Sequence, residues 1–389
     1  MNSYKRFLFY FFWISSLVFF YRTATFWMNT LYYETVHDSV MYGAIVCIYI
    51  VAFGLFLSNN HIKIKGVHAI CLLWFLLILI VLTRCHAPFS HYLKCLLWPV
   101  LFEITYLFVK NSKWVLKRLT ALFFIVSTMG LLFFLEAVSI RQFAGATNMI
   151  YFFVLTIPFL LLYNKKNWNT IVLALATIMA LLSMKMSMML SMSLFWIVIR
   201  IRYLGQKRNR AKAIILSVGL LLFVVISFVE VNKLTNGFLI ERIEREDQTN
   251  GRDVIFEQTF LMQMKSSTTE WVLGHGHNGV RADSPMDISA HNEWLEILYD
   301  YGLGCLLLYV CLWIYLIKRW YFHLKTKSIY FVSYSLSLCV FLVMSMVSQL
   351  VLYVSYFLYF VMYWATVEAL CENSYKYYKS NRLQKLVKN

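Results

Sequence analysis

The sequence predicts an all-α polytopic membrane protein, with about 12 transmembrane helices and one long extracytoplasmic loop that carries short amphipathic helices. Hydrophobic residues make up 60% of the 389 residues and charged residues 14%, whereas a soluble domain is nearer half apolar and a quarter charged. Apolar runs long enough to cross a bilayer follow one another along most of the chain. Residues 230–294 form the only long polar run.

Each expected span is a run of about 15 to 20 mostly apolar residues, close to the length that a helix needs to cross the hydrocarbon core. The expected spans are 7–21, 40–57, 67–83, 91–109, 119–138, 148–163, 170–183, 187–201, 212–229, 297–317, 329–347 and 350–367. The pair around 170–201 fits either two short helices or one broken helix. Because no internal repeat or low-complexity linker divides the chain, residues 1–389 are expected to form a single integral membrane domain.

The distribution of basic residues predicts the orientation. The net charge is +17, and the excess Lys and Arg lie in alternate loops when the N-terminus is placed in the cytoplasm. This positive-inside pattern explains the charge without nucleic acid as a partner. Both termini are therefore expected in the cytoplasm, with residues 230–294 outside. The first apolar segment follows Lys5 and Arg6 and is expected to be retained as a signal anchor.

Local patterns within residues 230–294 predict the elements of this loop. Phe256, Phe260 and Met264 recur at helical spacing and predict an amphipathic helix on the membrane surface. Opposite charges at i,i+4 spacing in residues 241–246 predict an exposed helical turn before it. The glycine-rich run 274–279 predicts a turn.

His291 is the candidate proton acceptor. We expect Asp287 or Ser289 to cap a helix whose first turn contains His291 and which continues into the next span. The partial positive charge of a helix N-terminus favours a neutral imidazole, which can accept a proton. Asn292 is expected to orient a substrate or the loop, and Glu293 points elsewhere around the helix. The alternative is an ordinary surface histidine at a helix start.

Three cations are the best candidates to hold a phosphate. Arg252 and Arg281 lie in the polar run, and a guanidinium pairs bidentately with phosphate oxygens. Lys185 lies between two apolar runs, where a charge is costly and marks a functional site. The alternative for Lys185 is a lysine in a short outer turn that extends to water.

The sequence predicts no metal and no cofactor. His275, His277 and His291 suggest zinc, but no HExxH motif is present, and His-x-His in a glycine-rich turn is common without a metal. No Asp-x-Asp motif is present either, so nothing indicates metal-dependent use of a nucleotide sugar. The eight cysteines contain no CxxC pair and none lies in residues 230–294, which argues against a disulfide framework or a zinc–thiolate site. Glu34 and Asp38 are the next candidates for a general base.

Four short motifs follow one another in the second half of the chain. They are Ser183-Met184-Lys185, Asn250-Gly251-Arg252, Gly274-His275-Gly276, and His291-Asn292-Glu293-Trp294-Leu295 leading into a span with Gly302 and Gly304. With this order and a long outer loop, the chain resembles the bacterial O-antigen polymerase and O-antigen ligase superfamily. The resemblance covers roughly residues 180–317, and Lys185 stands where the first family motif usually has arginine.

The resemblance implies a metal-independent glycosyltransferase that uses undecaprenyl-diphosphate-linked sugars at the outer face of the bacterial inner (plasma) membrane. It implies catalytic roles for His291, Arg252 and Lys185, in which the cations hold the diphosphate and the histidine lies at the reaction centre. The residues expected to bind substrate are Arg281, Asn292, Glu293, His275 and His277.

Three functions are compatible with the sequence. The first is a polymerase that joins lipid-linked repeat units into O-antigen, capsule or exopolysaccharide. The second is a ligase that transfers glycan to a lipid or protein acceptor. The third, a transporter or flippase of lipid-linked sugars, would show two related halves and polar residues at mid-membrane, and neither is evident. The expected partners are the undecaprenyl-diphosphate-linked oligosaccharide, the lipid bilayer, a chain-length regulator and a flippase.

Overall fold

The computed structural model describes residues 3–31, 39–58, 66–140, 148–162, 166–204, parts of 219–244, 251–285, 287–348, 350 and 354–387. The regular elements within these residues are all α-helices, which confirms the predicted all-α class. They are α1 (Ser3–Leu31), α2 (Ser39–Ser58), α3 (Val67–Arg84), α4 (Phe89–Cys95), α5 (Leu97–Asn111), α6 (Lys113–Ile140), α7 (Ile150–Val154), α8 (Ile157–Leu161), α9 (Lys166–Leu182), α10 (Met186–Leu204), α13 (Arg252–Met264), α14 (Thr268–Leu273), α15 (Gly279–Asp283), α16 (Glu293–Lys325), α17 (Phe331–Val347) and α18 (Val354–Val387).

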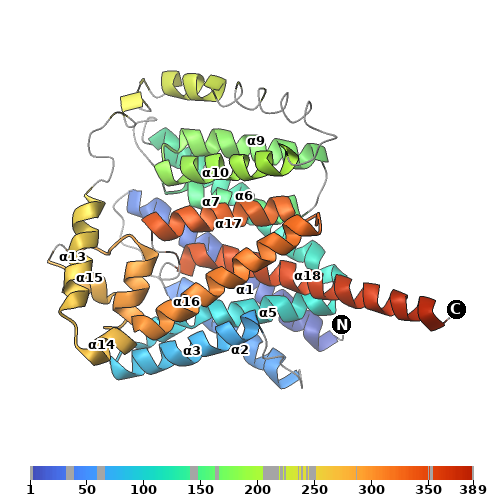
Figure 1. The fold of residues 1–389 in the computed structure, drawn as a ribbon, viewed down its shortest axis with the longest axis horizontal. Coiled ribbons are helices and arrows are strands. Elements are labelled where there is room, and N and C mark those ends of the chain that lie inside the picture. The colour runs from blue at the N-terminus through green and yellow to red at the C-terminus, as the bar shows by residue number, and fades with distance from the viewer. Residues whose placement is uncertain are drawn as a thin grey trace.

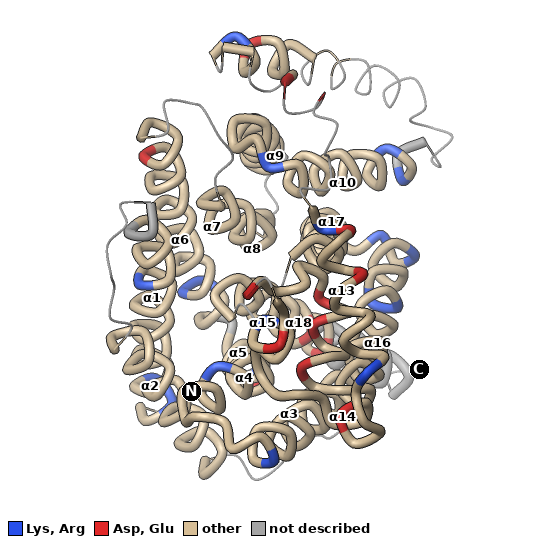
Figure 2. The backbone as a smooth tube through the Cα atoms, turned by 90° about the vertical axis from the view of Figure 1, so that its left-hand side faces the viewer, with Lys and Arg blue, Asp and Glu red and all other residues tan. Residues whose placement is uncertain are grey.

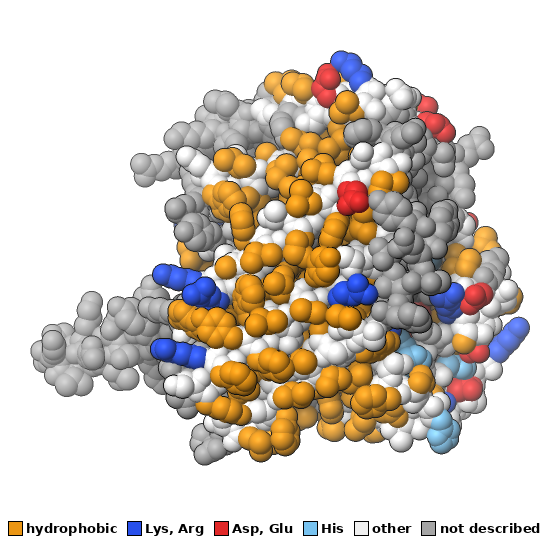
Figure 3. All heavy atoms as spheres, turned by 180° about the vertical axis from the view of Figure 1, so that it is seen from behind, with side chains coloured by type: hydrophobic (Ala, Val, Ile, Leu, Met, Phe, Trp, Pro, Cys, Tyr) orange, Lys and Arg blue, Asp and Glu red, His pale blue; other side chains and the backbone are white. Residues whose placement is uncertain are grey.

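Several of these helices are suited to a bilayer. Among the described residues, six are long and apolar enough to cross a membrane, or seven if α4 and α5, bent by 42°, form one broken span. Shorter apolar helices cover 150–161, 167–182 and 331–347. Hydrophobic side chains are spread across one whole face of the molecule, with few charged side chains among them (Figure 3). A face of this kind is suited to lipid, because a soluble protein rarely exposes so large an apolar area.

The long helices run side by side, with α13, α14 and α15 at one end of the molecule (Figure 1). Both chain termini lie towards the opposite end. Figure 2 looks onto the end that carries α13, α14 and α15, which lie in front of the other helices. The segment 251–291 is therefore placed at the helix ends, where a membrane protein meets the aqueous phase.

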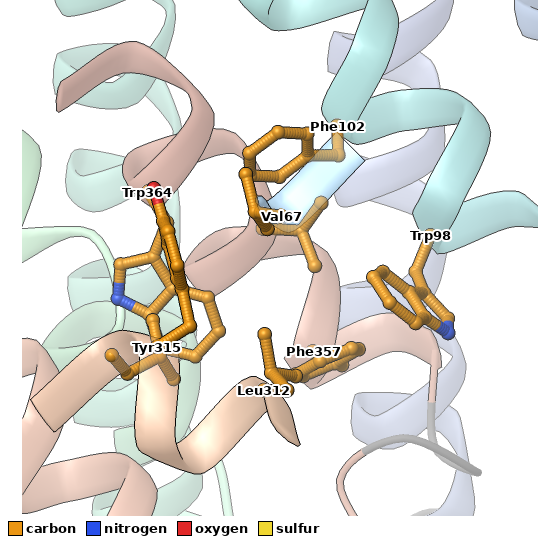
Figure 4. Close-up of a pocket in the computed structure, with 9 residues that line it drawn as sticks. Val67, Trp98, Phe102, Leu312, Tyr315, Phe357 and Trp364 are labelled. Carbon is orange, nitrogen blue, oxygen red and sulfur yellow. The ribbon is translucent and has the colours of Figure 1, made fainter. Parts of the chain in front are cut away.

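The helices meet in a packed aromatic core. Side chains of α3, α5, α16 and α18, among them Val67, Trp98, Leu312, Phe357 and Trp364, converge around one small void (Figure 4). The void measures about 10 Å³. A single water molecule needs about that much space, so this point holds the bundle together and offers no room for a substrate.

The expected span 148–163 is interrupted in the structure. It consists of α7 and α8, separated by a turn at residues 155–156. Pro158 follows the turn and has no N–H to donate to the carbonyl of Val154 four residues earlier. The expected pair around 170–201 consists of two helices, α9 and α10, which break at Ser183-Met184-Lys185. Met184 has a left-handed φ of +51° at this break.

Some expected elements lie wholly or largely outside the described residues. They are the span 212–229, the helical turn 241–246, the Asn250 position, and the alternative bases Glu34 and Asp38.

α16 bends sharply at Gly302, which has φ +77° and ψ −179°. The rings of Trp294 and Trp313 lie 6.2 Å apart across this bend, whereas a straight helix would separate the two residues by roughly 28 Å. The two halves of α16 therefore pack against each other. The bend also takes the carbonyls of Tyr299 and Asp300 out of the regular helical bonding pattern.

The glycine-rich run 274–279 attaches to this bend through the backbone. The amides of His275 and Gly276 donate to the carbonyls of Tyr299 and Asp300, at 2.9 and 2.7 Å. A Cβ on Gly274 would overlap the Asp300 carbonyl, and one on Gly302 would overlap the carbonyl of Val272. Two glycines thus allow the backbones to touch.

The Asp300 carboxylate completes this attachment. Its oxygens accept from the amides of Asn278 and Val280, at 2.9 and 3.0 Å. The side chain is fully buried, so these bonds supply part of the hydrogen bonding that a buried carboxylate requires.

We expect Gly302→Ala to destabilise the protein by roughly 3 kcal/mol or more, because the φ/ψ of Gly302 is accessible almost only to glycine and the added Cβ meets backbone. Thermal unfolding in detergent, followed by circular dichroism, is the measurement. Gly304→Ala is the matched control, since a Cβ there makes ordinary van der Waals contact at 3.4 Å. Equal stability of the two variants would contradict the backbone contact at Gly302.

Candidate functional site

α13 presents its apolar side to the outside. It begins at Arg252, directly after Gly251, whose φ is +74°. Thr259 and Gln263 are buried, while Phe260 and Met264 are more than half exposed. The predicted amphipathic helix is therefore confirmed, and its exposed apolar side is the side suited to a membrane surface.

His291 lies before the next helix rather than in its first turn. α16 begins at Glu293 and its N-cap is Asn292, so the expected caps Asp287 and Ser289 are wrong. The Asn292 side-chain oxygen accepts from the amides of Trp294 and Leu295, at 3.0 and 3.2 Å. His291 has a left-handed φ of +52°, which turns the chain into the helix.

In the structure, the charges of the two predicted cations act on the ring of His291. Burial lowers the pKa of His291 below its usual value, and the charges of Arg252 and then Lys185 lower it further. Both cations therefore lie close enough to act on the ring, although they come from separate segments of the chain. The imidazole is kept neutral mainly by burial and by these cations, not by the helix terminus that the sequence suggested.

Two polar side chains that sequence reasoning missed lie beside this cluster. The Tyr151 hydroxyl and the Ser187 Oγ are hydrogen-bonded at 2.8 Å. The charge of Arg252 also acts on the phenol of Tyr151, which lies on α7. A tyrosine in an apolar run gives no signal in the sequence, whereas Ser187 is two residues from Lys185.

The surroundings of Arg252 favour an anionic ligand. Arg252 is partly buried, and no carboxylate among the described residues forms an ion pair with it. A guanidinium that is partly removed from water and lacks an acidic partner favours an anionic ligand, and its planar shape suits phosphate oxygens.

Arg281 and Glu293, both predicted to bind substrate, have protein partners. Arg281 pairs with Asp287 through its Nε at 3.1 Å, at an exposed position, and holds the pKa of that carboxyl below its usual value. Glu293 is fully buried and its carboxylate accepts from the amide of Leu350. Glu293 thus fixes the start of α16 to the chain before α18.

His275 and His277 lie at the attachment of the loop to α16. The His275 Nε2 is 2.8 Å from the Ser266 Oγ, and its ring stacks on Tyr299 with centroids 4.0 Å apart. The His277 Nδ1 is 2.8 Å from the Tyr301 hydroxyl. Among the described residues, no group of His, Cys, Asp and Glu is arranged to hold a metal ion.

Buried acids in α16 were not anticipated. Glu296 and Asp300 are almost completely buried in a helix long enough to cross the membrane. The signal was available, since an acidic residue within an apolar run is costly and has a specific role. For Asp300 that role includes binding the loop backbone.

Comparisons with protein-family models and with curated proteins found no match. The chemistry that this site can perform follows from its side chains. A neutral imidazole can accept a proton, and two neighbouring cations can stabilise an anion that forms or departs beside it. This combination fits a group transfer with a phosphate leaving group.

We expect the His291 imidazole to titrate below the ordinary histidine pKa of about 6.5, and therefore to be neutral at pH 7. Lys185→Gln should raise this pKa towards 6.5, because one of the two positive charges that oppose protonation is removed. The measurement is an NMR titration of histidine-labelled protein in micelles, with His291→Gln to assign the signal. Lys265→Gln, an exposed position at the far end of α13, is the control. An unchanged pKa in Lys185→Gln would remove Lys185 from the cluster.

Proposed function

We propose that the protein polymerises undecaprenyl-diphosphate-linked oligosaccharide repeat units at the outer face of the bacterial inner (plasma) membrane, by metal-independent glycosyl transfer. The observation that carries the proposal is that a partly buried histidine, His291, experiences the positive charges of both Arg252 and Lys185. The motifs that contain these residues are those in which the chain resembles the O-antigen polymerase and ligase superfamily.

The proposed reaction uses each of these residues. A hydroxyl oxygen of the acceptor sugar attacks the anomeric carbon of the donor and forms the glycosidic bond. The bond from that carbon to the diphosphate oxygen breaks, and undecaprenyl diphosphate leaves with the electron pair. The hydroxyl proton passes to His291 and then to water. Arg252 and Lys185 stabilise the charge on the leaving group.

The position of α13 supports a substrate that is anchored in the membrane. Its exposed side chains include Phe260, Leu261 and Met264, which are suited to the boundary between headgroups and acyl chains. Arg252, at the start of the same helix, would then lie at the depth of a lipid diphosphate. In the proposed orientation this end of the molecule faces outward, and both termini, which lie towards the other end in Figure 1, are cytoplasmic.

We expect Arg252→Ala to reduce polymer formation by about 100-fold or more, because it removes a cation that stabilises the leaving group. Arg252→Lys should recover little, since an ammonium cannot form the bidentate contact. Lys185→Arg should keep most of the activity, because it restores the residue usual in the resembled family. The measurement is polymer formation from purified lipid-linked repeat units in liposomes.

Lys265→Ala is the matched control for these substitutions. It removes an exposed cation from the opposite end of α13 and should leave the rate unchanged. If Arg252→Lys produced polymer of full length at the wild-type rate, the bidentate role of Arg252 would be excluded.

We expect His291→Ala to reduce the rate by about 10² to 10⁴, the usual contribution of a general base, with normal insertion into the membrane. His291→Gln should be nearly as inactive if the ring accepts the proton, and partly active if it only binds the acceptor hydroxyl. His86→Ala, at an exposed position, is the control. Wild-type rates from His291→Ala would exclude a role for this residue. Loss of activity on chelation, restored by zinc, would favour a metal mechanism instead.

A further inference from the structure

α4 has two chemically different sides. Phe89, Tyr92 and Leu93 line an open groove of about 600 Å³. His91 and Lys94 lie on another side of this short helix, where the His91 ring meets that of His277 with centroids 4.5 Å apart. One short helix thus carries both apolar side chains that line the groove and basic side chains next to it.

The opposite wall of the groove is a stripe on α2. It is formed by Val46, Tyr49, Ile50 and Phe53, which recur at helical spacing. Ile50 and Phe53 are more than half exposed. The lining is almost wholly apolar, so the groove suits a hydrocarbon chain rather than a sugar.

Lys94 lies at one end of this groove. Its ammonium is 5.1 Å from the centre of the Tyr42 ring, and Tyr42 lies one helical turn before Val46 on α2. In the proposed orientation α2 starts at the outer face, so Lys94 is at the outer end of the groove. Among the described residues no carboxylate forms an ion pair with Lys94.

The basic side chains here are distinct from those around His291. Burial, with smaller contributions from His91 and Lys94, lowers the pKa of His277 to about 3. The cations that act on His291 are instead Arg252 and Lys185. His277 contacts the His91 ring and the Tyr301 hydroxyl, so Lys94 adds its positive charge beside the His91–His277 pair.

We propose that the α2–α4 groove and Lys94 form a second binding site for a polyprenyl diphosphate, with the polyprenyl chain in the groove and the phosphates at Lys94. This inference rests on the proposed function. A polymerase joins two reactants, each carried on its own molecule of the same kind of lipid diphosphate. It therefore needs one binding site for the donor and one for the acceptor. A ligase whose acceptor is a different molecule needs only the first.

The test counts the undecaprenyl diphosphate molecules that remain bound to the purified protein in native mass spectrometry. We expect two for the wild type and for Lys94→Arg, and one for Lys94→Glu, Lys94→Gln and Arg252→Ala. Ile50→Trp, which fills the groove, should also reduce the number to one. The matched controls are Lys117→Glu and Leu132→Trp, exposed positions on α6, and both should bind two.

The number of bound molecules distinguishes a wrong second binding site from a wrong proposed function. If Lys94→Glu and Ile50→Trp still bind two molecules, the second binding site is excluded. It is also excluded if phosphatidylglycerol displaces the second molecule as readily as undecaprenyl diphosphate does, because the groove then holds bulk anionic lipid only. If the wild type binds one molecule, and only Arg252→Ala loses it, the second binding site is excluded while the proposed function is retained with a single binding site. If the wild type binds none, both proposals fail.

Discussion

The backbone contact between residues 274–276 and the bend of α16 is the constraint on which the rest of the site depends. The bend at Gly302 exposes two carbonyls inside an apolar helix, and unpaired carbonyls there would be costly. The amides of His275 and Gly276 satisfy them, and the Asp300 carboxylate binds two further amides of the same loop. Since close approach and φ above zero are both required, glycine at 274 and 302 is a condition of the fold.

This attachment also determines where His291 lies. Residues 275 and 276 are hydrogen-bonded to Tyr299 and Asp300 in the first half of α16, and the chain then enters the same helix at Glu293. The segment before α16 is therefore attached to that half of the helix at both of its ends. Asn292 caps that half, Glu293 ties it to Leu350, and the Trp294 ring packs on the second half of α16. The helix start is thereby held from several directions, and the residue that precedes it is placed with little freedom. A reacting group needs this kind of support to keep its geometry.

Local sequence patterns predicted the all-helical class correctly, because apolar and amphipathic spacing depend on neighbouring residues. The count of 12 spans stays a prediction, since six or seven of the described helices are long and apolar enough to cross a membrane. Local patterns failed at the start of α16, since Asp287, Ser289 and Asn292 are all good N-caps and only tertiary contacts select among them. The bend at Gly302 and the role of Asp300 depend on a segment more than 20 residues away, so no local pattern describes them. The grouping of Lys185, Arg252 and His291 was expected from motifs, whereas Tyr151 entered the site only through folding.

The electrostatics of the cluster suit a reaction that starts only when the donor is bound. Without an anion, Arg252 and Lys185 oppose protonation of His291 and make it a weak base. A bound diphosphate brings negative charge against these cations and offsets their effect on the imidazole, at a position partly removed from water where charges interact more strongly. The basicity of His291 would therefore rise as the leaving group is bound. In the proposed reaction, the two cations thus have two effects, since they stabilise the departing diphosphate and couple the strength of the base to the presence of the donor.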